Sequence, residues 1–520
     1  MRWGASALLV AACGRIDFDP LGGDCPLWRL TDAPYANSSE GADGIDAPFL
    51  ICTPRQLDAI GSRPEDWNKA YVIGRDLEMS ELTTPFTIIG SPANRFTGTL
   101  DGGAHAIGHF VLDRPQDDYV GLFGSLGRGA QISNLKLATV SITGRDYVGA
   151  LAGYSEDTLS VQSVTVDGVI TGDKEVGGVL GYSNCLTECQ PYELRDVIVD
   201  VDLTATAGTG GGVLGGIYSN QFPAMPQIVD VHASGQARGA GGIGGIIGDA
   251  EYVEIRQASS SVTVTAGIGA GGVMGGSVYI ATKIIDSVAT GSVTCTGSAP
   301  VGGSTCGGLV GDMEGAVFRS YATGRVDCPG DYCGGLAGSL HGATESYATG
   351  AVSGRDHVGG LAGDAYGTDT VDCYARGDVT GRDQVGGLLG SVSDIMVLRN
   401  YATGRVIGND NVGGLVGAVG GSGAPRLEGN FATSSVSGTS ASDHVSLTFG
   451  QVTIGNILNN SYTTEATCTN TAGSCSVFGQ GVPAASDFYS AATPPLTSWD
   501  FSGVWQENAG ALPTLRNTPP

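Results

Sequence analysis

One short repeated sequence motif constrains the fold of this chain more than any other feature. Gly-Gly-aliphatic-X-Gly begins at Gly177, Gly211, Gly244, Gly271, Gly307, Gly334, Gly359, Gly386 and Gly413. Looser copies begin at Gly121 and Gly149, and most later copies follow one another after about 27 residues. A repeat of this length predicts a solenoid, in which each unit packs only against its neighbours.

The composition of each unit decides between strand and helix. Short runs with β-branched residues are separated by turn-forming pairs such as Thr-Gly and Ser-Gly, and the 520 residues include 86 glycines, which disfavours helix. Three strands and three turns per unit predict an all-β chain, a right-handed parallel β-helix of about a dozen coils. Adjacent coils lie about 4.8 Å apart, so the rod is about 60 Å long.

Stacking places equivalent residues of successive coils on top of one another. The position after the glycine pair predicts a core ladder of Val179, Val213, Ile246, Val273, Leu309, Leu336, Leu361, Leu388 and Leu415. An aromatic ladder is predicted at Tyr321, Tyr347, Tyr374, Tyr401, Phe431 and Tyr462. We expect these rings to be internal or half-buried, and stacking adds about 0.5–1.5 kcal/mol per ring pair.

The sequence motifs of the repeat also resemble those of a known family. "VGGLVG" repeated with "SYATG" resembles the GLUG-motif family of bacterial adhesin-like surface proteins, which also occurs beside the catalytic region of some IgA-cleaving metalloproteases. The lead-in "QLDAIGSRPEDWNKAYVIGRDLEMS" and the closing "WDFSGVWQENAGALPTLR" extend the likeness over roughly residues 48–516. The resemblance implies a β-solenoid on a cell surface and implies no reaction.

The ends of the chain have their own patterns. Residues 1–13 resemble a bacterial lipoprotein signal that ends in Val10-Ala11-Ala12-Cys13, so Cys13 is the expected lipidation site; an ordinary cleaved signal is the alternative. Residues 14–48 are expected to be a flexible tether, 49–99 the N-terminal cap and lead-in, 100–480 the repeats and 481–520 the C-terminal cap. By this interpretation the protein is exported and anchored to the outer membrane or cell surface of a Gram-negative-type bacterium.

Twelve cysteines fit an exported chain with disulfides. The candidates, in order, are Cys25, Cys52, Cys185, Cys189, Cys295, Cys306, Cys328, Cys333, Cys468 and Cys475. Two pairings are open for the central four. Stacking would join Cys295 to Cys328 and Cys306 to Cys333, whereas short loops slightly favour Cys295–Cys306 and Cys328–Cys333 within coils. Zinc binding by four cysteines together is a minor alternative to the disulfides. Cys373 is left without a partner and is expected to be a buried ladder residue.

No pattern of catalytic residues stands out, and no cofactor is expected. His105 and His109 lie in a strand-and-turn context and not in HExxH, and neither Gly-X-Ser-X-Gly nor Gly-Lys-Ser/Thr occurs. The Arg-Gly-Asp tripeptide at Arg376 is interpreted as sequence drift in one turn. A net charge of −26 argues against nucleic acid as a partner.

Acidic residues recur just before the glycine pair. Asp146, Asp173, Asp356, Asp383 and Asp410 would stack as one column, and like charges that close repel one another. Neighbouring Arg145, Arg355 and Arg382 offer charge compensation, with calcium as the minority alternative.

Three functions follow for such a rod. The first is a non-enzymatic, lipid-anchored surface protein, adhesin-like or structural, whose partners beyond the outer membrane are glycans or other surface proteins. The second is a carbohydrate-active β-helix enzyme, a polysaccharide lyase or hydrolase, which would need carboxylates that break the repeat. The third is a glycan-binding scaffold with exposed tyrosines. The regular recurrence of the acidic residues favours the first.

Overall fold

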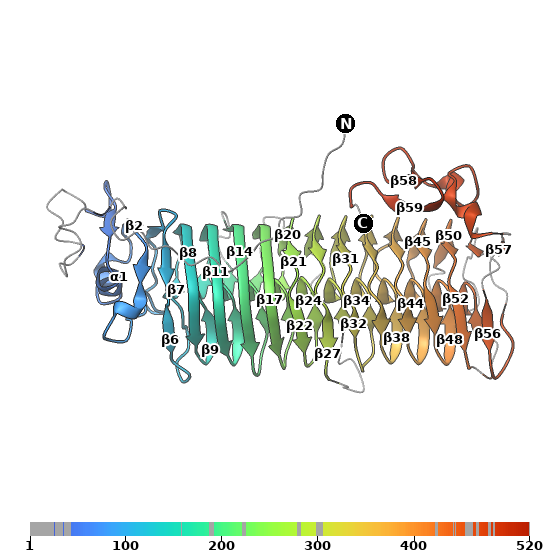
Figure 1. Ribbon diagram of the computed structural model, residues 1–520, viewed down its shortest axis with the longest axis horizontal. Coiled ribbons are helices and arrows are strands. Elements are labelled where there is room, and N and C mark those ends of the chain that lie inside the picture. The colour runs from blue at the N-terminus through green and yellow to red at the C-terminus, as the bar shows by residue number, and fades with distance from the viewer. Residues whose placement is uncertain are drawn as a thin grey trace.

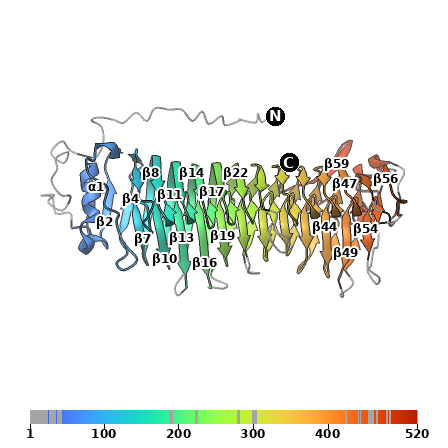
Figure 2. The same cartoon turned by 90° about the horizontal axis from the view of Figure 1, so that it is seen from below.

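The computed structural model is a parallel β-solenoid, a long rod of stacked coils (Figures 1 and 2). It describes residues 25, 35 and 43–518, except 158, 187–191, 221–224, 278–281, 298–304, 422–424, 440, 442–443, 453–460, 464–466, 477–479 and 482–483. The predicted signal at 1–13, with Cys13, lies outside these residues. The predicted all-β class and parallel stacking are confirmed. Among the described helices, none has the length and apolar character needed to cross a bilayer.

One side of the rod is a 12-stranded parallel sheet with one strand per coil, so the estimate of about a dozen coils is confirmed. Its strands run side by side along the rod in Figure 2. They are β7 (Phe123–Leu126), β10 (Ala152–Glu156), β13 (Leu180–Cys185), β16 (Leu214–Ser219), β19 (Ile247–Glu251), β24 (Met274–Ser277), β29 (Val310–Met313), β34 (Ala337–Leu340), β39 (Ala362–Ala365), β44 (Leu389–Ser393), β49 (Val416–Gly420) and β54 (Phe449–Val452).

A second, 11-stranded parallel sheet precedes it in every coil after that of β7. Its strands are β9 (Asp146–Gly149), β12 (Lys174–Gly177), β15 (Gly210–Gly211), β18 (Ile243–Gly244), β23 (Ala270–Gly271), β28 (Cys306–Gly307), β33 (Cys333–Gly334), β38 (Asp356–Gly359), β43 (Asp383–Gly386), β48 (Asp410–Gly413) and β53 (Val445–Ser446). Each ends on the glycine pair or its equivalent, which forms the corner between the two sheets.

Glycine is required at this corner because backbones approach closely there. A Cβ on Gly359 would lie 1.9 Å from Ala362 O, and one on Gly360 would lie 2.1 Å from Gly387 O. Side chains cannot be accommodated at such distances without moving the backbone. The repeated glycine pair therefore reflects close backbone packing at the corner, within the coil at Gly359 and with the next coil at Gly360.

The remaining side of each coil belongs to a 34-stranded sheet. In early coils it is one long strand, namely β8 (Ala130–Thr143), β11 (Leu159–Gly172), β14 (Tyr192–Ala205) or β17 (Gln227–Gly239). From β20 (Glu254–Arg256), β21 (Ser259–Ser260) and β22 (Thr263–Ala266) onward it is split into short strands. The long strands and the short triplets pair in register, so the rod continues without a break.

The core ladder is stacked as predicted. Its nine aliphatic side chains are all buried, and backbone hydrogen bonds join successive members, such as Leu336 N to Leu361 O at 2.7 Å and Leu361 N to Leu388 O at 2.7 Å. Cys373, also expected to be buried, is a free thiol in a second, polar internal column. Its backbone N–H donates to Asn400 Oδ1 at 2.7 Å, and the Asn400 N–H donates to Asn430 Oδ1 at 2.9 Å.

The N-terminal end is closed by helix α1 (Pro54–Gly61) and the short helices η3 (Pro64–Asp66) and η4 (Met79–Glu81), as Figure 1 shows for α1. Thr53 caps α1 by accepting from Gln56 N, and Trp67 Nε1 donates to Ile60 O at 2.8 Å. Two described positions of the predicted tether are attached to this cap. Cys25 is joined to Cys52, and buried Tyr35 packs 5.1 Å from Phe49. At these two positions the segment is held, contrary to the expectation of a free tether.

The C-terminal segment corrects the prediction of an end cap. It comprises η5 (Ala485–Tyr489), η6 (Leu496–Ser498) and the antiparallel pair β58 (Trp505–Asn508) and β59 (Ala511–Leu515). Figure 1 shows it folded back along the side of the rod, over coils that include β45 (Met396–Leu398) and β50 (Arg426–Glu428). It covers the aromatic ladder, which faces outward. Tyr347, Tyr374, Tyr401 and Phe431 are buried beneath it, with Phe488, Leu496, Trp499, Trp505 and Leu515 as covering side chains.

Polar contacts fix this cover. Trp499 Nε1 donates to Gly429 O and Trp505 Nε1 to Asp372 Oδ1, both at 2.9 Å. Arg376 lies over the Tyr374 ring at 4.7 Å and donates to Tyr401 Oη at 2.9 Å and to Pro513 O at 3.2 Å. The ladder rings stack 4.6–4.9 Å apart, as predicted, but they are buried by the chain terminus and not by the central core. Tyr321 and Tyr462, at the two ends of the ladder, are partly buried.

Candidate binding face

The outer surface of the 12-stranded sheet, together with the corner that leads into it, carries the candidate site. We call this surface the tyrosine face. Its first column occupies the corner, and the register gives Tyr119, Tyr147, Glu175, Thr209, Gly242, Gly269, Thr305, Tyr332, His357, Gln384 and Asn411. Its second column, on the strands, contains Tyr154, Tyr182, Gly216, Asp249, Gly276, Asp312, Ser339, Asp364, Ser391 and Ala418.

The backbone turns each corner residue outward. Tyr147, Glu175 and His357 have φ values of 60°, 55° and 55°, in the left-handed region. Such values are uncommon outside glycine, asparagine and aspartate. Positive φ recurs at the corners on both sides of the four middle coils, which carry Thr209, Gly242, Gly269 and Thr305 without it, so it is not strain confined to one site.

Four tyrosines gather at the N-terminal end of the face. Tyr119 and Tyr147 stack with ring centroids 4.9 Å apart, and Tyr154 and Tyr182 are roughly parallel at 6.3 Å. Tyr147 joins the two pairs, with edge contacts of 6.1 Å to Tyr154 and 5.9 Å to Tyr182. All four rings are half-buried, so each keeps a solvent-facing part.

A second aromatic group lies further along the same face. Tyr332 stacks on His357 at 4.6 Å, and His341 meets Tyr366 edge-on at 5.7 Å. His357 Nδ1 lies 2.8 Å from Ser391 Oγ, which donates to Asp364 Oδ1 at 2.6 Å. This network holds the second group in place.

Glycines separate the two aromatic groups. Gly216, Gly242, Gly269 and Gly276 occupy outward positions in three consecutive coils; we call them the glycine gap. Unlike the corner pair, Gly242 and Gly276 are not required by close contacts. The nearest described atom to a Cβ on Gly242 would be 3.6 Å away, and none lies within 4 Å of one on Gly276. Among the described residues, no side chain comes closer than van der Waals contact to these two positions.

Carboxyl groups border the glycine gap. Burial raises the pKa of Glu175 to about 7, partly offset by a hydrogen bond from Thr209 Oγ1 at 2.8 Å and reinforced by the charge of Asp249. Burial also raises the pKa of Asp249 to about 6 and that of Glu251 to about 7. On the far side of the gap, burial raises the pKa of Asp312. Glu175 is the one carboxyl in the corner column given above, whereas Asp recurs in the strand column at Asp249, Asp312 and Asp364.

The elevated pKa of Glu175 predicts a pH-dependent stability. The folded pKa of about 7 exceeds the ordinary value of 4.5, so the contribution of Glu175 to stability is present at low pH and is lost as pH rises toward and through 7. The groups that influence it are Thr209, Asp249, Asp146 and Lys174. The melting temperature of Glu175→Gln should therefore lie slightly above that of the wild type at pH 5 and further above it at pH 8.

Differential scanning calorimetry at both pH values measures this effect. Glu65→Gln, at an exposed position of the N-terminal cap, is the matched control and should track the wild type at both. A Glu175→Gln melting difference that stays constant between pH 5 and 8 would contradict a buried, proton-binding Glu175.

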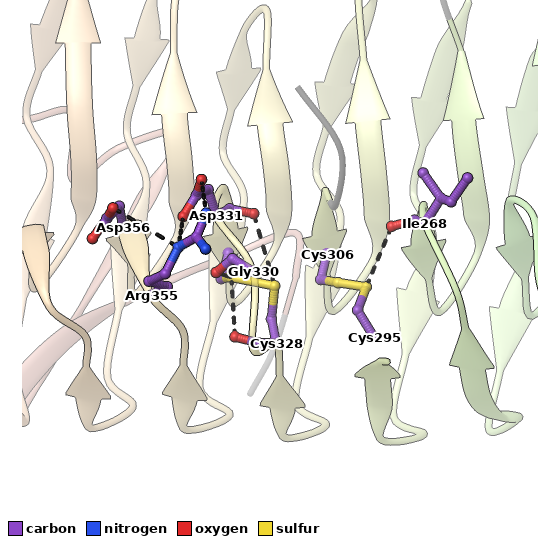
Figure 3. The surroundings of a disulfide bond; sticks show 9 residues. Ile268, Cys295, Cys306, Cys328, Gly330, Asp331, Arg355 and Asp356 are labelled. Carbon is purple, nitrogen blue, oxygen red and sulfur yellow. Dashed lines mark hydrogen bonds and ion pairs between the residues drawn. A yellow bond between two sulfur atoms is a disulfide. The ribbon is translucent and has the colours of Figure 1, made fainter. Parts of the chain in front are cut away.

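The structure joins the cysteines within coils. Cys468 is bonded to Cys475. Among the central four, Cys295 is bonded to Cys306 and Cys328 to Cys333, which is the alternative that the sequence slightly favoured (Figure 3). The sulfurs of Cys295, Cys306 and Cys328 all lie within 4.8 Å of one another, because stacking brings the two bridges together. Cys185 is disulfide-bonded, and its predicted partner Cys189 lies outside the described residues.

The other sequence-predicted sites are structural. Arginines pair with aspartates of the preceding coil, such as Arg355 Nη2 with Asp331 Oδ2 at 2.6 Å (Figure 3) and Arg145 Nη2 with Asp118 Oδ2 at 2.6 Å. This arrangement is the charge compensation that the sequence favoured; calcium stays an untested alternative. His105 and His109 pair with different carboxylates, those of Asp76 and Glu78.

Neither the tyrosine face nor the glycine gap was found from sequence. The signal was present, because Tyr119, Tyr147, Tyr154 and Tyr182 each hold a fixed offset from a glycine pair or its looser copy. The sequence does not show that the corner column and the strand column point to the same side of the rod.

Comparisons with known proteins agree with a repeat protein. No protein-family model matches the chain. It is 33% identical to halomucin of Haloquadratum walsbyi over 146 residues, 26% of this chain and 2% of halomucin. It is 31% identical to the immunoglobulin A1 protease of Streptococcus pneumoniae serotype 4 over 119 residues, 23% of this chain and 6% of the protease. The chain thus matches only a small part of each relative.

Among solved structures, a Bacteroides ovatus protein described as an immunoglobulin A1 protease aligns over 92% of this chain and 96% of its own, at 14% identity with a TM-score of 0.24. A score this low carries no argument. The shared sequence segments and the stacked parallel coils fit an adhesin-like repeat protein.

Proposed function

We propose that this chain is a non-enzymatic surface protein, adhesin-like or structural, that uses the side of the solenoid for multivalent binding. The observation that carries the proposal is the tyrosine face, where outward rings and carboxyls recur in register over successive coils. A periodic face offers many weak contacts to a repeating partner, so avidity replaces a single deep pocket.

Export and anchoring complete this proposal. The four described disulfides suit an oxidising compartment outside the cytoplasm. The repeated motifs support membership of the GLUG-motif surface proteins. The Val10–Cys13 pattern supports a lipid anchor in the outer membrane of a Gram-negative-type bacterium. The covered ladder and the compensated Asp–Arg corner leave the tyrosine face as the proposed working surface.

A second candidate function has one observation in its favour. Glu175 and Glu251 each interact electrostatically with Asp249 beside the tyrosines, and the pKa values of all three lie in the range useful for proton transfer. A polysaccharide hydrolase or lyase would use carboxyls of this kind. Aromatic groups at two places on the face, on either side of these carboxyls, favour binding over catalysis.

Protease treatment of intact cells, combined with cell-binding measurements on the purified chain, tests the proposal. We expect the wild-type chain to be cleaved on intact cells, and Cys13→Ala to leave the outer-membrane fraction. The purified chain should bind cells without shortening any polysaccharide. A chain protected inside the cell, or one that releases sugar fragments, would overturn the proposal.

A further inference from the structure

The molecule has two outward aromatic columns, which differ in how much of them the rest of the chain covers. The ladder that includes Tyr347, Tyr374 and Tyr401 is buried under the C-terminal segment, whose tryptophans fill the space above the rings. No described segment covers the tyrosines of the tyrosine face in the same way, and Tyr119, Tyr147, Tyr154 and Tyr182 remain partly exposed. The covered column shows what an internal partner for such rings looks like, so the uncovered column is available to an external one.

The chemistry of the face distinguishes between kinds of partner. No outward position named above in the two columns carries leucine, isoleucine, valine, methionine or arginine. Protein interfaces are enriched in aromatic side chains, methionine and arginine and depleted of carboxylates, so the tyrosines fit either kind of partner and the carboxyls distinguish between them. Here carboxyls lie between the aromatic groups. The face therefore suits a ligand that is flat and weakly apolar on its faces and rich in hydroxyl donors at its edges.

The charge of the face further restricts the class of ligand that it can bind. Glu175, Asp249 and Asp312 offer hydrogen-bonding carboxyls to hydroxyl groups, and at pH values above their raised pKa values they repel uronate, sulfate or phosphate. Arg95, a basic side chain at the N-terminal end, is paired with Glu156 at 2.7 Å. The chain as a whole carries a net charge of −26. Anionic polymers are thus disfavoured both locally and at long range.

We propose that the tyrosine face binds an uncharged polysaccharide lengthwise, with sugar rings stacked on Tyr154 and Tyr182 and the chain continuing across the glycine gap toward Tyr332. This inference rests on the proposed binding function and names its ligand class. Open positions at Gly242 and Gly276 leave room for the sugar chain between the aromatic groups, and Glu175 and Asp249 accept hydrogen bonds from its hydroxyls.

Affinity electrophoresis and calorimetry with the full chain test the proposal. The probes are soluble uncharged polymers (an α-glucan, a β-glucan, a mannan and a xylan) beside anionic alginate and polygalacturonate. We expect binding to at least one uncharged polymer and to neither anionic one. Raising NaCl to about 0.5 M should change the affinity little, since no ion pair is involved.

Two variants locate the binding. Tyr154→Ala/Tyr182→Ala should weaken it roughly tenfold or more, because two stacking contacts are lost. Gly242→Phe should weaken it similarly by filling the gap, and its Cβ meets no close contact, so the fold is retained. Tyr321→Ala, which removes a ring stacked at 4.6 Å in the other aromatic column, is the matched control and should change affinity less than about twofold.

The outcomes separate this inference from the proposed function. Preference for an anionic polymer, binding to none of the polymers, or equal losses in Tyr154→Ala/Tyr182→Ala and Tyr321→Ala would overturn the polysaccharide proposal. If the chain still binds whole cells in those cases, the proposed surface function stands with another ligand. If it binds no cells either, both fall.

Discussion

Leu361→Ala is expected to lower the free energy of unfolding by about 2–5 kcal/mol, the usual cost of emptying a buried leucine site. Leu361 is buried in the core ladder, and its backbone is bonded to Leu336 and Leu388 on either side. Neither neighbour can move into the space, because each is fixed by its own coil. In a solenoid the loss also weakens both adjoining interfaces.

Denaturant unfolding measures the loss, and hydrogen exchange locates it. Protection should fall most in the coils of β34, β39 and β44. Thr380→Ala, an exposed strand position in the neighbouring coil, is the matched control and should stay within about 0.5 kcal/mol of the wild type. A Leu361→Ala loss no larger than that of the control would show that the aliphatic column is not the core.

Trp505→Ala is expected to detach the C-terminal segment from the rod. The side chain is buried, its ring lies 4.4 Å from Trp499 and 5.9 Å from Tyr401, and its Nε1 donates to Asp372. Truncating a buried tryptophan costs about 3–5 kcal/mol, and here the cost falls on a short segment with little core of its own. The aromatic ladder should become accessible while the coils remain folded.

Limited proteolysis shows the detachment directly. Cleavage between residues 484 and 518 should be fast in Trp505→Ala and slow in the wild type, with a protected solenoid fragment in both. Gln506→Ala, the next and exposed residue of β58, should behave as wild type. Equal cleavage rates for the two variants would mean that tryptophan packing does not hold the segment.

The covered ladder also bears on the Arg-Gly-Asp tripeptide. Arg376 is engaged with Tyr374, Tyr401 and Pro513 beneath the C-terminal segment, whereas Asp378 is exposed. An arginine held in this way cannot serve as a free recognition side chain. Its role is to join the ladder to its cover, which agrees with the interpretation of the tripeptide as drift in one turn.

The cysteines show where sequence reasoning was limited. Cys306 and Cys333 are register neighbours, as the stacking argument required, yet each bonds within its own coil. Both pairings are within reach when sulfurs of two coils lie this close, so repeat spacing alone could not choose. The local path of each loop decided it.

The sequence by itself determined the strands, the glycine corner, the core ladder and the stacked aromatic rings. A fixed period places equivalent residues in contact, so a column can be read directly from the copies of the repeat. Only the tertiary structure decided which columns share an outer face and which face is covered. Glu175 and Asp249 flank one gap although they stand two coils apart, and Trp505 reaches Asp372 across 133 residues. Such contacts depend on the cross-section of the coil and on the C-terminal segment folding back along the rod. The repeat period determines neither of these.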